Sequence, residues 1–230
     1  ALFAARADKT HVEMEDFEEA RDKLLMGIAR KSRLISDEEK RKTAVHESGH
    51  ALMHYYLKHA DPLHKVSVVP RGRALGVAVS LPEKDDYAKG MGWLLDRIKI
   101  AFGGFVAENM FFQETTTGTA NDLKQATEIA RKMVSEWGMS KLGPVSYSQE
   151  EEPIFIGKEI ARHKDYSELT SQKIDEEIRE ILASCRKEVE ELLSEHKDQL
   201  EKLSEELVTK ETLADEEVRV LLGFPKRKKP

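Results

Sequence analysis

Two histidines and a glutamate stand at a spacing that suits a zinc hydrolase. The sequence His46-Glu47-Ser48-Gly49-His50 matches the pattern HExxH. On a helix, positions i and i+4 lie on one face one turn apart, so both imidazoles can reach one tetrahedral ion. Glu47 can take a proton from a metal-activated water and pass it to a leaving amine. The spacing therefore predicts a zinc peptidase with His46 and His50 as ligands.

A catalytic zinc needs a third protein ligand and an open fourth position. The metzincin pattern would place a glycine and a histidine where this chain has Met53 and Tyr56, which excludes that family. Two downstream carboxylates remain as candidates. Glu108 lies in an apolar helical stretch, and Asp122 stands at the start of a later amphipathic helix, where the helix macrodipole also favours an acid. Spacing alone leaves both open.

Other histidines follow the motif, but helix geometry argues against them as ligands. His54 continues the i+4 series, yet one straight helix cannot bring it to the same ion as His46 and His50. We expect His54, His59 and His64 to be packing or surface residues.

The motif needs a helix, which we predict from Thr43, as its N-cap, to Lys58. Gly49 weakens a helix interior by about 1 kcal/mol, which suggests close packing against a neighbouring backbone. Lys65 to Val69 reads as a strand, and Ala74 to Leu81 as a second strand that could lie at a sheet edge.

The remaining pattern is mostly helical, so the predicted fold is mainly α with a small β-sheet or hairpin. Gly27 ends a helix or acts as a hinge before a linker at Arg30 to Arg33, and Gly103-Gly104 either interrupts a helix or allows close packing. The predicted helices cover two short segments in 1–30, then 85–112, 121–137, 165–207 and 215–222.

Composition narrows the class of protein. A net charge of -6 over 230 residues argues against a nucleic-acid partner, and the basic tail at 226–230 is too short to change this. The single cysteine, Cys185, excludes an internal disulfide, and we expect a buried thiol in a reducing compartment. No apolar run could span a bilayer, and no GxxxxGK[ST] loop for ATP is present.

Several separate motifs, in one order, resemble the FtsH family of membrane-anchored AAA+ zinc proteases. The segments that carry the resemblance are Thr43 to Ala51, His64-Lys65-Val66, Pro70 to Gly76, Gly103-Gly104, Asn121-Asp122-Leu123, Ala126-Thr127, Trp137 to Ser140 and Glu211-Thr212-Leu213. They cover nearly the whole chain.

The resemblance implies a helical HExxH zinc-peptidase domain that forms a homo-oligomer, a hexameric ring. It implies that an aspartate in an Asn-Asp pair is the third ligand, which maps to Asp122 rather than Glu108. It divides the chain into the end of an ATPase lid with its linker at 1–30, a peptidase domain at 31–225 with long helices from about 165, and the tail. ATP, Mg²⁺ and membrane anchors would belong to a missing N-terminal part. The substrates would be unfolded proteins, with this soluble domain in the cytoplasm or an equivalent organelle interior.

The chain departs from the family pattern at a few positions. Ser48 replaces a usual Ala, while Phe105 and Asn109 replace a common Arg and Glu, which affects packing or subunit contacts rather than the zinc site. A different class of function also fits the helices at 165–222. They could form a non-catalytic oligomerisation module around a structural zinc, which would need four protein ligands.

Overall fold

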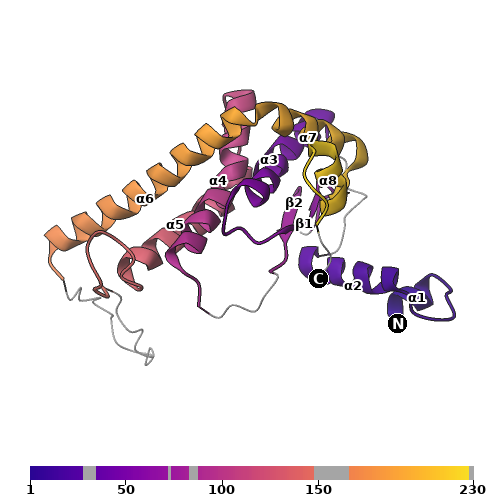
Figure 1. The fold of residues 1–230 in the computed structure, drawn as a ribbon, viewed down its shortest axis with the longest axis horizontal. Coiled ribbons are helices and arrows are strands. Elements are labelled where there is room, and N and C mark those ends of the chain that lie inside the picture. The colour runs from indigo at the N-terminus through magenta and orange to yellow at the C-terminus, as the bar shows by residue number, and fades with distance from the viewer. Residues whose placement is uncertain (28–34, 72–73, 83–87, 148–165, 228–230) are drawn as a thin grey trace, which may run out of the picture.

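The computed structural model describes residues 1–27, 35–71, 74–82, 88–147 and 166–227. Helices dominate, and three short strands form one antiparallel sheet, as the predicted fold class requires. The elements are α1 Leu2–Arg6, α2 Met14–Met26, α3 Asp37–Tyr56, β1 Leu63–Ser67, β2 Val77–Ser80, α4 Met91–Phe112, the 3₁₀ turn η1 Thr117–Thr119, α5 Ala120–Ser135, α6 Glu168–Glu195, α7 Lys197–Lys210, β3 Thr212–Ala214 and α8 Asp215–Leu222 (Figure 1).

The helix that carries the HExxH motif begins earlier than predicted. Ser36 is the N-cap of α3, and its side chain accepts a hydrogen bond from the backbone N–H of Glu39 at 3.1 Å. Three acidic residues follow in the first turn, where the helix macrodipole favours negative charge. The prediction of Thr43 as the cap is therefore wrong: Thr43 lies inside the helix, and its hydroxyl donates to the carbonyl of Glu39.

Helices α3 and α4 cross at two glycines, which explains why the chain accepts glycine inside both. A Cβ placed on Gly49 would overlap the carbonyl oxygen of Gly103, and a Cβ on Gly103 would lie 2.6 Å from the carbonyl oxygen of Gly49. The two backbones are in direct contact, as the sequence suggested for Gly49. This crossing fixes the distance between the motif helix and the part of α4 that faces it.

The sheet has the order β2-β1-β3, so β2 lies at an edge, as the sequence suggested for Ala74 to Leu81. Strand β1 pairs with β2 through Ser67 and Val77, and with β3 through Val66 and Leu213. The third strand was not predicted, because its three residues gain their stability from distant β1 rather than from a local pattern. Of the residues between the two predicted strands, positions 72–73 lie outside the described residues.

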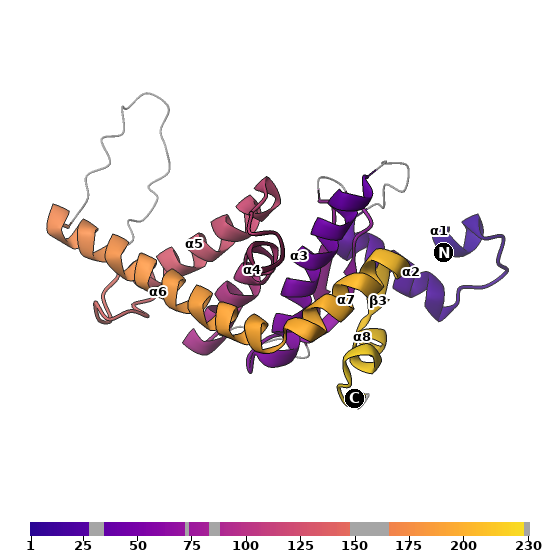
Figure 2. The same ribbon diagram turned by 90° about the horizontal axis from the view of Figure 1, so that it is seen from above.

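The long C-terminal helical stretch is two helices rather than one. Helix α6 ends at Glu195 and α7 begins at Lys197, with His196 between them. Seen from above, α6 and α7 run along one side of α3, α4 and α5, with which they pack (Figure 2). Cys185 of α6 is buried, as predicted. The core gathers large, fully buried side chains from these helices, among them Leu52, Ile98, Met133, Leu193 and Leu203.

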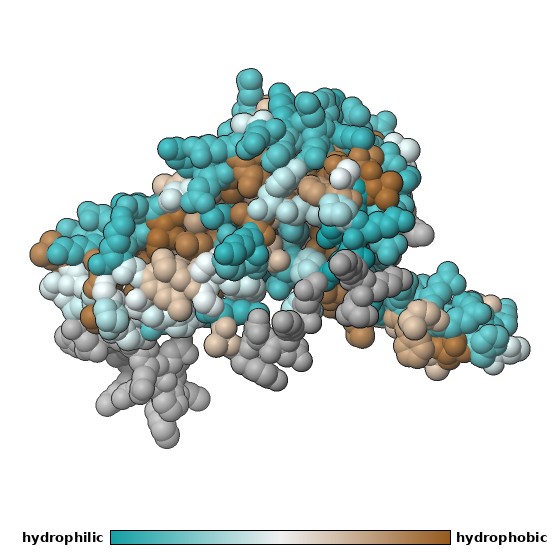
Figure 3. All heavy atoms as spheres, viewed as in Figure 1, coloured by the Kyte–Doolittle hydropathy of each residue, from teal (hydrophilic) through white to brown (hydrophobic). Residues whose placement is uncertain are grey.

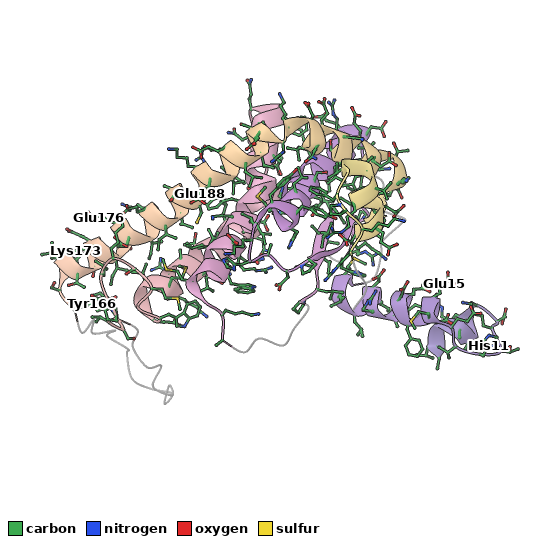
Figure 4. All side chains as sticks on the ribbon, in the orientation of Figure 1. His11, Glu15, Tyr166, Lys173, Glu176 and Glu188 are labelled. Carbon is green, nitrogen blue, oxygen red and sulfur yellow. The ribbon has the colours of Figure 1, made fainter. Side chains whose placement is uncertain are left out.

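Helices α1 and α2 extend away from the rest of the chain, with His11 at the far end of the extension (Figure 4). Polar contacts hold α2 to β1, because the carboxylate of Asp22 accepts from His64 Nε2 at 3.1 Å and from Lys65. Beyond these contacts the extension exposes hydrophobic surface, including 86% of Leu24 (Figure 3). The predicted linker at 30–33 lies outside the described residues. Among the described helices, none is both long and apolar enough to cross a bilayer.

Candidate metal centre

The two motif histidines aim the same ring nitrogen at one point. His46 and His50 lie one turn apart on α3, with ring centroids 4.6 Å apart and planes nearly perpendicular. Their Nε2 atoms are 3.0 Å from each other. Both side chains are nearly buried, with 12% and 11% of their surfaces exposed. The helical spacing has thus produced the convergence that the sequence predicted.

The other nitrogen of each ring is already engaged. Nδ1 of His50 lies 2.7 Å from the carbonyl oxygen of Ile100 in α4. Nδ1 of His46 lies 2.7 Å from Oε1 of Glu108, also in α4. Because a carbonyl and a carboxylate only accept hydrogen bonds, both Nδ1 atoms carry hydrogen and donate. The Nε2 atom of each ring is therefore available to bind a group placed between the two rings.

Asp122 completes the group from the first turn of α5. Its Oδ2 lies 3.3 Å from Nε2 of His46 and 3.5 Å from Nε2 of His50. Among the described residues, these three form a group of possible metal ligands whose atoms all lie within 4.8 Å of one another. Zinc bonds of 2.0–2.1 Å in a tetrahedron place ligand atoms about 3.3 Å apart. The spacing and chemistry of the three groups fit zinc.

The electrostatics of the group favour a positive charge among the three side chains. Burial lowers the pKa of His46, but hydrogen bonds to Asp122 and Glu108 outweigh it and raise this pKa to about 10. Burial raises the pKa of Asp122, but the hydrogen bonds with His46 and His50 hold it well below its usual value. The centre therefore favours binding a proton or a cation.

Glu108 lies beside the group but faces the other edge of the His46 ring. Its Oε2 accepts from the backbone N–H of Thr116 at 2.7 Å, while Oε1 accepts from His46. Burial alone would raise the pKa of Glu108. The hydrogen bonds with His46 and Thr116 outweigh burial and lower this pKa, so the group is ionised. Of the two candidates that spacing left open, the structure brings Asp122 to the two Nε2 atoms and gives Glu108 the role of orienting His46. A buried glutamate in an apolar helix needs such a partner, which is the only hint the sequence offered.

Glu47 is placed for proton transfer beside the histidines. Its side chain is buried, with 6% of the residue exposed, between α3 and the segment that leads into β2. Burial raises its pKa, which the histidines partly oppose and Asp122 reinforces. A raised pKa makes the ionised carboxylate a stronger proton acceptor, and the protonated form can return the proton.

Gly104 gives the His46 ring its place against α4. A Cβ on Gly104 would lie 2.5 Å from Cε1 of His46 and 2.6 Å from its Nδ1. The ring therefore packs directly on the α4 backbone, within reach of Glu108. The sequence left open whether Gly103-Gly104 interrupts a helix or allows close packing; α4 continues through both glycines, and they provide the close packing.

The three histidines that follow the motif, His54, His59 and His64, stay outside the group, as predicted. Nδ1 of His54 donates to the carbonyl of Asp61 at 2.6 Å. His59 is exposed, and His64 pairs with Asp22.

Comparison with known proteins identifies one family and a set of relatives that share one name. The pattern of Peptidase family M41 matches residues 33–221. A protein of Borreliella burgdorferi named ATP-dependent zinc metalloprotease FtsH is 55% identical over 229 residues, which are 99% of this chain and 36% of that protein. Proteins of the same name from Acidobacterium capsulatum and Thermotoga maritima are 48% and 44% identical, over 96% and 97% of this chain and 35% and 37% of their own lengths. The chain thus spans about a third of the length of the relatives it matches.

Proposed function

The chain belongs to peptidase family M41, and from this premise we propose that it is a zinc endopeptidase domain. One observation carries the proposal. The Nε2 atoms of His46 and His50 and a carboxylate oxygen of Asp122 lie 3.0 to 3.5 Å apart, while both Nδ1 atoms are engaged elsewhere. Three protein ligands with a fourth position left open are typical of catalytic rather than structural zinc. The names of the relatives support the same metal.

The chain's own groups divide the work of hydrolysis. When bound, zinc supplies Lewis acidity that polarises a carbonyl and acidifies water. A carboxylate oxygen of Glu47 takes the proton from the attacking water and later delivers it to the nitrogen of the leaving amine. Glu108 holds the His46 ring through its Nδ1–H, and the carbonyl of Ile100 holds His50 in the same way.

An extended substrate has an edge strand available next to these groups. Among the described residues, strand β2 pairs with β1 on one side only, and Gly76, which leads into it, packs against Glu47. A substrate segment that added to β2 as a further strand would present its main chain beside the base. Binding of this kind recognises backbone, so we propose unfolded protein segments as substrates.

The whole protein would be an ATP-dependent, membrane-anchored protease. Residues 1–32 precede the part that matches the peptidase family, and the exposed hydrophobic side chains of α1 and α2 would pack against a preceding ATPase. We assign residues 1–30 to the end of the ATPase lid and its linker, and the peptidase ring to six copies of this domain. Membrane anchors would precede the chain, with this domain in the cytoplasm or an equivalent organelle interior.

The rival hypothesis, a non-catalytic module around structural zinc, needs a fourth protein ligand. The two residues considered for that role are engaged elsewhere, since Glu108 bonds to His46 and Thr116, and His54 bonds to Asp61. No observation favours this alternative.

Bound zinc per chain, together with casein hydrolysis, tests the proposal. We expect Asp122→Ala to lose both, because a ligand is gone. Asp198→Ala, which also removes an acid from the first turn of a helix, should lose neither. Glu47→Gln should keep zinc and lower turnover by about 10² to 10⁴-fold, the usual contribution of a general base. Retained zinc and activity in Asp122→Ala would show that Asp122 only begins a helix.

A further inference from the structure

A glycine outside the HExxH motif limits the space around its glutamate. A Cβ placed on Gly76 would lie 2.7 Å from both Cγ and Oε1 of Glu47, closer than such atoms can approach. The same Cβ would lie 2.8 Å from Cγ2 of Thr43, one turn earlier on α3. The backbone at Gly76 therefore lies directly on the carboxylate arm, with no room for a side chain.

The backbone conformation does not by itself require glycine at this position. Gly76 is absent from the glycines with a positive φ, which among the described residues are Gly27, Gly138, Gly143 and Gly223. An alanine could adopt its conformation, so the requirement for glycine comes from its neighbours.

Glu47 has little freedom to avoid a new methyl group. The residue is 6% exposed, and the two motif histidines flank it on the same helix. A flexible carboxylate arm on the surface would swing away at little cost, but an enclosed arm moves only by leaving its rotamer or disturbing its neighbours.

We propose that Gly76 is a positioning residue for the proton-transferring carboxylate: its missing side chain sets where Oε1 of Glu47 lies. The inference rests on the proposed function for its catalytic consequence, but the contact itself does not depend on that function. Gly76 also leads into β2, the strand proposed to bind substrate. One backbone segment would therefore position both the bound substrate and the carboxylate of Glu47. A displacement of about 1 Å at a reacting group can cost 10²-fold in rate.

The first test measures stability without zinc, in four proteins kept in a chelator: the parent, Gly76→Ala, Glu47→Ala and the double variant. Urea unfolding should show that Gly76→Ala lowers the folding equilibrium constant about tenfold, within the usual cost of overpacking. With Glu47 truncated to Ala, the same substitution should cost clearly less than in the parent, because Cγ and Oε1 are gone and only the contact with Thr43 remains. Gly90→Ala is the matched control, since a Cβ there meets nothing within 4 Å. Equal losses in both backgrounds would overturn the contact.

The second test measures zinc content and the kinetics of peptide hydrolysis in the zinc-loaded proteins. Gly76→Ala should keep one zinc per chain and lower kcat at least about tenfold, with KM changed less than about threefold. In a Glu47→Gln background it should lower the residual rate no further. An unchanged kcat in Gly76→Ala, or the same fold-loss in both backgrounds, would overturn the positioning role. An inactive zinc-loaded parent would instead refute the proposed function, while the urea comparison would still decide the contact.

Discussion

Oε1 of Glu108 lies 2.7 Å from Nδ1 of His46, while Nε2 of the same ring faces Asp122. The imidazole thus connects a buried carboxylate in α4 with the carboxylate in α5 that we propose as a zinc ligand. This arrangement fixes the tautomer of His46 and increases the basicity of the nitrogen that would bind zinc.

Replacing Glu108 with Gln should weaken zinc binding rather than abolish it. An amide can still contact the ring, but it no longer supplies the negative charge that supports His46. We expect a 10 to 100-fold loss of zinc affinity, the usual effect of losing such a partner. Competition with a chromogenic chelator measures it. The exposed Glu114→Gln is the control, and equal affinities in the two variants would contradict the role of Glu108.

Substitution of Gly49 by Ala should destabilise the whole domain. The new Cβ would overlap a backbone carbonyl of α4, which cannot rotate away as a side chain can. We expect a loss of about 3 kcal/mol in the free energy of unfolding, at the upper end of ordinary overpacking. Urea denaturation checks it against Gly90→Ala. A loss below about 1 kcal/mol would mean that α3 and α4 separate easily.

Replacing Ser48 with Ala should stabilise the protein. The residue is fully buried, and its hydroxyl oxygen has no hydrogen-bond partner in the part of the chain that the structure describes. Removing a buried hydroxyl that makes no bond recovers its desolvation cost, about 1 kcal/mol. Urea unfolding of the zinc-free proteins measures the change. A loss of stability would show that the hydroxyl makes a bond after all.

The sequence predicted those parts of the site that depend on local geometry. His46 and His50 follow from one helix, because a helical turn places positions i and i+4 on one face whatever surrounds them, and Glu47 directly follows the first histidine. The choice between Asp122 and Glu108 could not follow from spacing, since both lie on later helices whose packing against α3 is a tertiary property. Only the family resemblance separated them.

Features that depend on contacts between distant parts of the chain were not predicted either, because such contacts are a tertiary property. Strand β3 has three residues and exists because β1 pairs with it. The contact between Gly76 and Glu47 leaves no periodic pattern. The true start of α3 at Ser36 was missed although its cap is local, because Thr43 stands closer to the motif and offers an equally plausible hydroxyl.

His54 should make stability depend on pH. Burial lowers its pKa to about 4, although the hydrogen bond to Asp61 opposes the shift. Between pH 4 and about 6.5, the unfolded chain therefore binds a proton at this position that the folded chain does not. Its contribution to stability is complete above about pH 6.5 and is lost as the pH falls toward 4, by up to about 3 kcal/mol.

The variant His54→Asn isolates this effect, because an amide can still donate to the carbonyl of Asp61 but does not titrate. Urea unfolding from pH 4 to 7, with zinc removed from both proteins by a chelator, should show a shallower fall in stability for the variant. Removing zinc matters because metal binding itself depends on pH and would otherwise add its own slope to both stability curves. Parallel curves for the two proteins would show that His54 is already protonated in the folded state, or that it titrates alike in both states.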